Sequence, residues 1–210
     1  MEKEKMLVTQ ALNELKVLDS RIDREIRTAN FVAAAKKAEK KVTPNVTKEE
    51  FNNSAKANMQ SIEDLIDRRA RIKKAVVASN AVTVLEVNGE TMTVADALEL
   101  KSSIDYKRTL LATLKTQLSK AQLSVSTSNK ILEDKIDNVI TAMVGNGDKK
   151  VNKDDYEQMT VPMREAGEYA LVDPLQAEKK IADMETYIEG FLGNVDSALQ
   201  ISNCITYIEV

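Results

Sequence analysis

The side chains that most often carry catalysis or bind transition metals are nearly absent from this sequence. It has no histidine, and Cys204 is its one cysteine. Histidine is the commonest general base and metal ligand in proteins, so this inventory excludes the familiar zinc sites and Ser-His or Cys-His catalysis. The remaining aspartate, glutamate, lysine and tyrosine residues form no recognisable catalytic arrangement. We therefore predict a protein that is not an enzyme and that uses no cofactor or small-molecule substrate.

One polar loop has a spacing that resembles a calcium-binding EF-hand loop. Residues 145–155 read GNGDKKVNKDD, and Val151 fits the hydrophobic eighth position of such a loop. Positions three, five, nine and twelve are then occupied by Asn146, Asp148, Asn152 and Asp155. However, Val144 stands where the first aspartate ligand belongs, and Lys149 replaces the turn glycine. An ordinary loop in which Asn152 caps the next helix explains the same residues, so we predict no metal site.

Two basic clusters could contact phosphate groups. The first contains Arg68, Arg69, Arg71, Lys73 and Lys74, and the second contains Lys36, Lys37, Lys40 and Lys41. A helix spreads such runs around its circumference, and acidic residues that can pair with the first cluster lie one turn upstream. These residues are Glu63, Asp64 and Asp67. We predict solvated, salt-bridged helix faces; the alternative is contact with a nucleic-acid backbone, which would weaken steeply with salt.

The composition favours a helical protein without a strong overall charge. The 210 residues are 43% hydrophobic but only 4% aromatic, and three prolines and six glycines suit long uninterrupted helices. A net charge of −3 creates no field that would gather nucleic acid or an anionic membrane. No window reaches the roughly 18 consecutive apolar residues of a membrane-spanning helix, and the start lacks a signal-peptide pattern. We expect a cytoplasmic or virion protein that does not bind membranes and is not secreted through a signal peptide.

Hydrophobic spacing predicts two long helices in the first part of the chain. Apolar residues recur every three or four positions from about Lys3 to Glu39, which is typical of an amphipathic helix. The stretch from Val42 to Val46 contains a proline and interrupts this pattern. Thr47, with Glu50 three residues later, is a capping-box signature and predicts the start of a second helix.

The middle of the chain changes from helical to strand-like spacing and back. Residues 82–87 are apolar and β-branched, and the tight-turn dipeptide Asn88-Gly89 follows them. Thr93 then predicts the cap of a third helix, whose apolar residues keep a seven-residue rhythm that is broken by Lys107. The residues of this row are Ala97, Leu100, Ile104, Leu111, Leu114, Leu118 and Ala121. Lys107 could set the oligomeric state, or the helix could rotate there.

Shorter elements are predicted in the last third of the chain. The Ser/Thr-rich stretch from Leu123 to Asn129 is interpreted as a linker. A short helix is expected over residues 131–143 and another from Asp154 to Ala166, followed by a brief extended piece. The dipeptide Asp173-Pro174 combines an N-cap residue with proline at the first helical position, which predicts the start of the last helix.

The end of the chain repeats an earlier segment. Residues 202–210 match residues 79–87 position for position, with five identities in nine. We predict a mainly α fold of long antiparallel helical hairpins that resemble a coiled-coil bundle, with a duplicated helix-helix-strand unit and a small β element. Residues 1–92 form the first repeat and 93–210 the second, interrupted by an inserted small helical subdomain at about 123–172. The two strands are expected to pair with each other or with another subunit.

The layout of long helix, Asn-containing exit, apolar strand, turn and Thr-capped helix resembles a family of bacteria and phages that is labelled septicolysin-like. The stretches that carry the resemblance are VADALELKSSID from Val94 and EYALVDPLQAEKKIADMETYIEGFLGNVDSALQISN from Glu168. The resemblance covers most of the chain outside the predicted insertion. It implies a helical-hairpin architecture of unsettled role, and it implies no site residue.

These patterns favour a non-enzymatic structural or interaction protein. Thin helical hairpins leave apolar faces open, so we expect a homo-oligomer that also contacts other proteins of a larger assembly, such as the capsid or tail of a phage virion. The expected interaction residues are Leu111, Leu114, Leu118, Val84, Ile205 and Tyr207. Two alternatives stay open: a membrane-active or pore-forming, toxin-like protein, and a protein that binds the backbone of nucleic acids.

Overall fold

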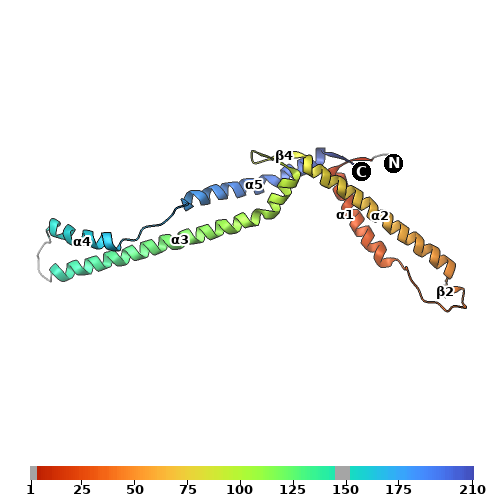
Figure 1. The fold of residues 1–210 in the computed structure, drawn as a ribbon, viewed down its shortest axis with the longest axis horizontal. Coiled ribbons are helices and arrows are strands. Elements are labelled where there is room, and N and C mark those ends of the chain that lie inside the picture. Colours follow the sequence, from red (N-terminus) through yellow and green to blue (C-terminus); the bar gives the residue numbers. More distant parts are fainter. Residues whose placement is uncertain (1–3, 145–151) are drawn as a thin grey trace. The chain divides into compact units, whose positions relative to one another are not determined.

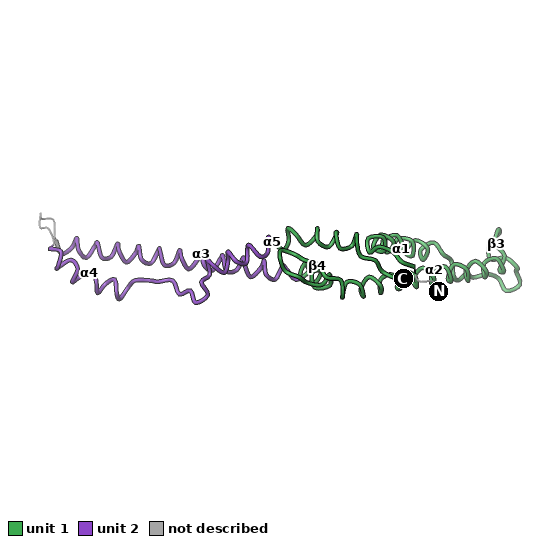
Figure 2. The backbone as a smooth tube through the Cα atoms, turned by 90° about the horizontal axis from the view of Figure 1, so that it is seen from above, with its two compact units in different colours: residues 1–102, 191–210 green, residues 103–190 purple. Residues whose placement is uncertain are grey.

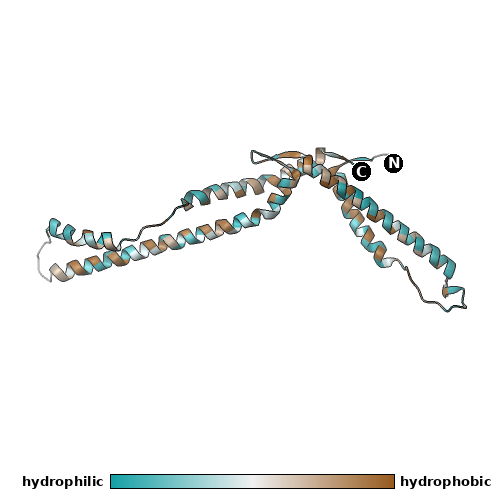
Figure 3. Ribbon diagram, in the orientation of Figure 1, coloured by the Kyte–Doolittle hydropathy of each residue, from teal (hydrophilic) through white to brown (hydrophobic). Residues whose placement is uncertain are grey.

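A computed structural model describes residues 4–144 and 152–210, and within them the fold is mainly α-helical (Figure 1). The helices are α1 (Val8–Thr28), α2 (Lys48–Val82), α3 (Val94–Val144), α4 (Lys153–Gly167) and α5 (Ala177–Ile205). The strands are β1 (Lys5–Leu7), β2 (Lys41–Thr43), β3 (Val46–Thr47), β4 (Val84–Val87), β5 (Glu90–Thr93) and β6 (Tyr207–Glu209). Hydrophobic and hydrophilic residues alternate along the helices, as amphipathic packing requires (Figure 3).

The chain divides into two units (Figure 2). Unit 1 consists of Met1–Ser102 and Phe191–Val210, and it contains α1, α2, the strands, the start of α3 and the end of α5. Unit 2 consists of Ser103–Gly190 and contains the rest of α3, helix α4 and the start of α5. The division between the units thus falls within α3 and within α5, and each unit contains a part of both helices.

The core of unit 1 lies where α1 packs on α2 beneath the sheet of β1 and β6. Ile72 and Ala11 are completely buried there, because apolar residues three and four positions apart share one face of each helix. The buried members of this cluster are Met6, Val8, Ala11, Leu15, Leu18, Ile72, Val76 and Ile208. This core holds together elements from both ends of the chain.

The predicted turn between β4 and β5 is confirmed. Asn88 and Gly89 have φ angles of 53° and 81°, the left-handed values that a two-residue turn of type I′ requires. Leu85 and Val87 are buried while Val84 and Glu86 are exposed, which is the alternation of a strand with one covered face. Thr93 caps α3 as expected: its hydroxyl accepts a hydrogen bond from the N–H of Asp96 at 3.0 Å.

The prediction that the two similar strands pair with each other is wrong. Strand β4 pairs with β5, and β6 pairs with β1, with Met6 opposite Ile208. Both partner strands directly precede a long helix, and such short strands carry too little periodicity to be separated from the helix that follows. The N–H of Val94 donates to the carbonyl of Thr83, and the N–H of Val8 donates to that of Thr206, both at 2.9 Å. The two strand–helix junctions thus make matching contacts, while the boundaries of the predicted duplication stay a prediction.

The first helix is shorter than predicted. It begins at Val8 and ends at Thr28, and residues 29–40 are not helical. The N–H of Ala29 still donates to the carbonyl of Glu25 at 3.0 Å, and Ala29 then takes an extended conformation that ends the helix. Beyond Phe31 and Val32 the segment offers alanines and charged residues but no further row of large apolar side chains, and a helix in water needs such a face to bury.

The linker predicted from Leu123 to Asn129 does not exist, because α3 continues through it to Val144. Serine and threonine cost only about 0.5 kcal/mol each in a helix relative to alanine, and no glycine or proline interrupts α3. The seven-residue spacing also continues through this stretch to Val125, Ser128 and Leu132, which are all half-buried. The short helix predicted over residues 131–143 is therefore the end of α3.

The last helix starts later than the Asp173-Pro174 signal predicts. The two carboxylate oxygens of Asp173 accept hydrogen bonds from the N–H groups of Leu175 (3.2 Å) and Ala177 (2.7 Å). Gln176 has a φ of 52°, and α5 begins at Ala177. The dipeptide thus opens a turn, and the helix follows it. Helix α4 matches its prediction to within a residue at each end and keeps Pro162 inside.

Candidate interaction surfaces

The predicted interaction residues of α3 lie on one row in unit 2. Leu111, Leu114 and Leu118 are each half-buried. Helix α5 runs antiparallel beside this row, since Lys115 pairs with Glu185 and further along Gln122 donates to Glu178 at 3.0 Å. A single neighbouring helix covers one side of such a row, so the leucines keep part of their surface open to water.

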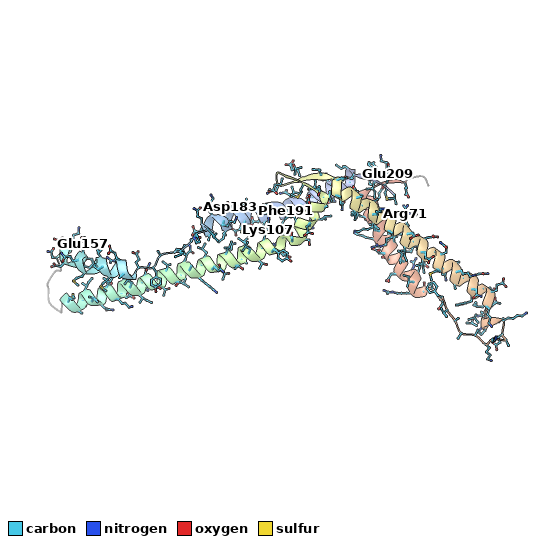
Figure 4. All side chains as sticks on the ribbon, in the orientation of Figure 1. Arg71, Lys107, Glu157, Asp183, Phe191 and Glu209 are labelled. Atoms are coloured by element: carbon cyan, nitrogen blue, oxygen red, sulfur yellow. The ribbon has the colours of Figure 1, made fainter. Side chains whose placement is uncertain are left out.

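Lys107 occupies a core position of the seven-residue rhythm, and the structure shows how its charge is accommodated (Figure 4). Its Nζ lies 3.9 Å from the centroid of the Tyr187 ring, within the range of a cation–π interaction. A cavity of about 330 Å³ beside this contact is lined mainly by apolar side chains, including Leu110, Met184 and Ile188. The lysine therefore contributes a stacked cation to the α3–α5 contact in place of an apolar side chain.

Helix α4 is attached to α3 by a two-point ion pair. Arg164 donates to the two carboxylate oxygens of Glu133 at 2.9 and 2.8 Å. These bonds lower the pKa of Glu133, and together with a hydrogen bond to Tyr156 they raise the pKa of Arg164. A bidentate guanidinium–carboxylate contact fixes orientation as well as distance, so it sets the register of α4 on α3.

This ion pair predicts an acid-sensitive attachment of α4. Because the pKa of Glu133 lies below its ordinary 4.5 in the folded state, the contact is fully stabilising above that pH. The stabilisation is lost as the pH falls through the lowered value. We expect amide hydrogen exchange in α4, corrected for the intrinsic rate at each pH, to accelerate over that range. Glu133→Gln should show the faster exchange already at neutral pH, and a variant with unchanged α4 protection would contradict this expectation.

The segment between α4 and α5 forms an exposed apolar surface in unit 2. Its position is fixed at one end by Asn129, whose side chain bonds the backbone N–H and carbonyl of Tyr169 at 2.7 and 2.9 Å. At the other end lies the contact of Gln122 with Glu178. Within the described chain, no hydrogen bond joins the backbone of residues 170–172 to another element. The exposed apolar residues of this segment, called the unit 2 patch below, are Tyr169, Leu171, Val172 and Leu175.

The unit 2 patch was missed by sequence reasoning. The sequence predicts a brief extended piece over residues 169–172. The pattern of apolar and polar residues in one short segment does not show which of its side chains a neighbouring element covers. Val172 is 90% exposed and Leu175 64% exposed. Four large apolar residues between two helices, without helical spacing of their own, are the signal that could have indicated an open surface.

The other predicted interaction residues lie on unit 1, and all are exposed. Val84 is on β4, Tyr207 is on β6, and Ile205 is the last residue of α5. The Nζ of Lys5 lies 4.8 Å from the centroid of the Tyr207 ring, so part of that ring is covered. These three residues belong to unit 1, whereas the predicted leucines of α3 belong to unit 2.

Two residues of the first basic cluster, Arg68 and Arg69, form salt bridges, but their partners differ from the prediction. Arg68 donates to Glu14 of α1 at 2.8 Å and pairs with Glu4 at 2.7 Å, and Arg69 pairs with Asp19. The hydrogen bond from Arg69 lowers the pKa of Asp19. The acidic residues one turn upstream were expected to serve instead, but α2 turns this arginine face toward α1. The pairs thus join two helices of unit 1.

The second basic cluster is not on a helix, contrary to the prediction. Lys36, Lys37 and Lys40 lie in the segment after α1, and Lys41 is in β2. The argument that a helix disperses these charges around its circumference therefore fails. The lysines gather instead at a turn and the β2–β3 hairpin.

The EF-hand-like residues fall partly outside the described residues. Asn146 and Asp148 lie outside them, Asn152 is the N-cap residue of α4, and Asp155 is in the first turn of that helix. In residues 4–144 and 152–210, no group of three or more acidic or cysteine side chains could hold a metal ion. Over the same residues, none of the helices has the length and apolar content to cross a membrane.

Comparison with known proteins adds no identification. The chain matches no protein-family model, no curated protein and no solved structure. The resemblance to the septicolysin-like family therefore stays a prediction, and the functional interpretation depends on the surfaces described above.

Proposed function

We propose that this chain is a non-enzymatic structural protein that associates with copies of itself through unit 2, as a component of a larger assembly such as a phage virion. The observation that carries the proposal is the unit 2 patch, where a non-helical segment leaves large apolar side chains in water. Contiguous exposed apolar surface typically marks a site of protein association. A virion is the proposed assembly because structural components of this kind often lack histidine and catalytic motifs, as this sequence does.

The thin core of unit 2 supports the same proposal. Among the described residues of this unit, six are buried: Ile104, Ile136, Thr160, Ala177, Ile181 and Ile188. The leucine row of α3 is only half-covered by α5. Two helices cannot enclose a core by themselves, whereas four helices can bury rows of this kind from all sides. The α3–α5 pair of a second copy would therefore bury the leucine row that one chain leaves half-exposed.

A second copy is the occupant that fits this surface best. Helix α5 carries apolar residues with the same seven-residue spacing as α3, at Ala177, Ile181, Met184 and Ile188. Three of these residues, Ala177, Ile181 and Ile188, are already buried within one chain, so the half-buried leucine row of α3 and the unit 2 patch are the apolar surface left for a second copy. An isologous contact, in which the same surface from two copies is self-complementary, would cover it. Other proteins of the assembly would then bind the surfaces that the oligomer leaves exposed.

Sedimentation velocity across a concentration series tests the proposal. We expect the full chain to form a dimer or larger oligomer, and Val172→Asp with Leu175→Asp to weaken association at least tenfold, because each change places a charge in an apolar contact. These side chains are 90% and 64% exposed, so the helix content measured by circular dichroism should not change. The matched control is Thr116→Asp with Ser124→Asp, at exposed positions of α3 outside the patch. A wild-type chain that stays monomeric at high concentration would end this proposal.

A further inference from the structure

The end of unit 1 formed by residues 36–48, called the basic tip here, has a local charge opposite to that of the whole chain. It contains five lysines and one glutamate, a formal charge of +4, although the whole chain carries −3. Lys48 holds this segment in place, since its Nζ donates to the carbonyls of Lys36 and Lys37 at 2.8 and 3.2 Å. The positive charge is thus concentrated by the fold.

Two lysines of the basic tip remain available to a ligand. Lys36 pairs with Glu39 at 3.2 Å, and the Nζ of Lys41 donates to the carbonyl of Pro44 at 2.9 Å. In contrast, Lys37 and Lys40 are exposed, and their ammonium groups pair with no carboxylate of the described residues.

The nearby acid Glu50 is engaged elsewhere. It bonds the N–H and hydroxyl of Thr47, both at 2.8 Å, in the capping box of α2. These bonds lower the pKa of Glu50, and the charge of Lys41 lowers it further. The capping role keeps this carboxylate at the helix end, so it does not neutralise the exposed ammonium groups of the tip.

An exposed apolar residue, Val32, borders the same cavity as the β2–β3 hairpin of the basic tip. Residues 31–35 read Phe-Val-Ala-Ala-Ala, and the side chain of Val32 is 90% exposed. Val32 borders an open cavity of about 400 Å³, whose other apolar lining includes Val42, Val46 and Phe51. With Glu49 and Glu50 at the start of α2 included, residues 36–50 keep a formal charge of +2. The tip therefore combines a net positive charge with aliphatic surface in water.

We propose that the basic tip binds the surface of a lipid bilayer that contains anionic phospholipids. Lysines next to such a surface are attracted by its negative potential, and an adjacent aliphatic side chain gains free energy by entering the interfacial region. A nucleic-acid backbone would attract the same lysines but would offer Val32 no apolar partner. Stacking with bases needs exposed aromatic rings, whereas Phe31 and Phe51 are both half-buried. The contact is peripheral and replaces the sequence-level expectation that the protein does not bind membranes.

Flotation of the full chain with vesicles tests this inference. We expect binding to vesicles of phosphatidylcholine mixed with phosphatidylserine, little binding to phosphatidylcholine alone, and release by added salt. The double variant Lys37→Glu, Lys40→Glu should bind the mixed vesicles at least roughly 25-fold more weakly, since each lysine near an anionic surface contributes about fivefold. Val32→Ser should weaken binding without changing its salt dependence.

The matched control is Lys120→Glu with Lys130→Glu, two exposed lysines of α3 that change the net charge equally. It should retain binding within about threefold, as expected for charges that are not part of the contact surface. Equal losses in both double variants would overturn the proposal, as would equal binding to both vesicle compositions. A gel shift with DNA that is lost in the tip variant, without vesicle binding, would assign the tip to nucleic acid instead. Self-association is measured on separate variants, so either proposal can fail alone.

Discussion

Replacing Ile72 by alanine should lower the free energy of unfolding of unit 1 by about 2–5 kcal/mol. The side chain is completely buried on α2, in the cluster that joins α1, α2, β1 and β6. Removing most of it loses the free energy of burial and leaves a cavity, because the surrounding helices relax only in part. Urea denaturation, followed by hydrogen exchange of the α1 and α2 amides, measures this loss separately from unit 2.

Val77→Ala is the matched control for this experiment. Val77 lies on the same helix but is 54% exposed, so its truncation should change the free energy of unfolding by less than about 0.5 kcal/mol. Similar losses in both variants would show that Ile72 does not lie in the core of unit 1.

Phe191→Ala should have an effect of about 3–5 kcal/mol, the range for truncation of a buried aromatic ring. Phe191 is the largest fully buried side chain in the described residues, with 2% exposure, and it lies where α5 enters unit 1. We expect the loss to appear as faster hydrogen exchange in the part of α5 that belongs to unit 1 and in the start of α3, where Lys101 pairs with Asp196. The control Ile201→Ala removes a side chain of α5 that is 63% exposed. Equal exchange protection of these segments in the two variants would refute this assignment.

In the register of the predicted duplication, Phe191 occupies the position that corresponds to Arg68. The side chains at these two positions differ in chemistry and in burial. Arg68 is partly exposed and pairs with Glu14, whereas Phe191 is buried and apolar. A half-exposed ion pair contributes little net free energy because water screens it. This contrast explains why the truncation of Phe191 is expected to be the more damaging change.

The sequence predicted those elements whose signals are local. The hydroxyl of Thr47 accepts a hydrogen bond from the N–H of Glu50 at 3.2 Å, as the capping-box spacing requires. Asn88-Gly89 adopts the positive φ values for which this dipeptide is favoured. The mainly α fold followed from composition and from hydrophobic spacing over long windows. In each case the determining interactions lie within a few residues of one another.

Elements that depend on distant partners could not be predicted in this way. Strand β1 forms because β6, from the other end of the chain, lies beside it. Helix α3 continues through its Ser/Thr-rich stretch because the half-buried row of seven-residue spacing continues past it to Leu132. The packing of this row outweighs the small cost of serine and threonine in a helix. The unit 2 patch and the basic tip depend on which residues stay uncovered, and exposure is a property of the folded chain.

The pairing of β1 with β6 brings the two ends of the chain together. The N–H of Val210 donates to the carbonyl of Glu4 at 2.9 Å, and the N–H of Glu4 donates back at 3.2 Å. In the other sheet, a two-residue turn joins β4 directly to β5. No such turn joins β6 to β1, so only one of the two sheets is closed by a covalent connection between its strands. A circular permutant that starts at Gly89, with its former ends linked, would exchange the open and closed sheets and keep the same strand pairs.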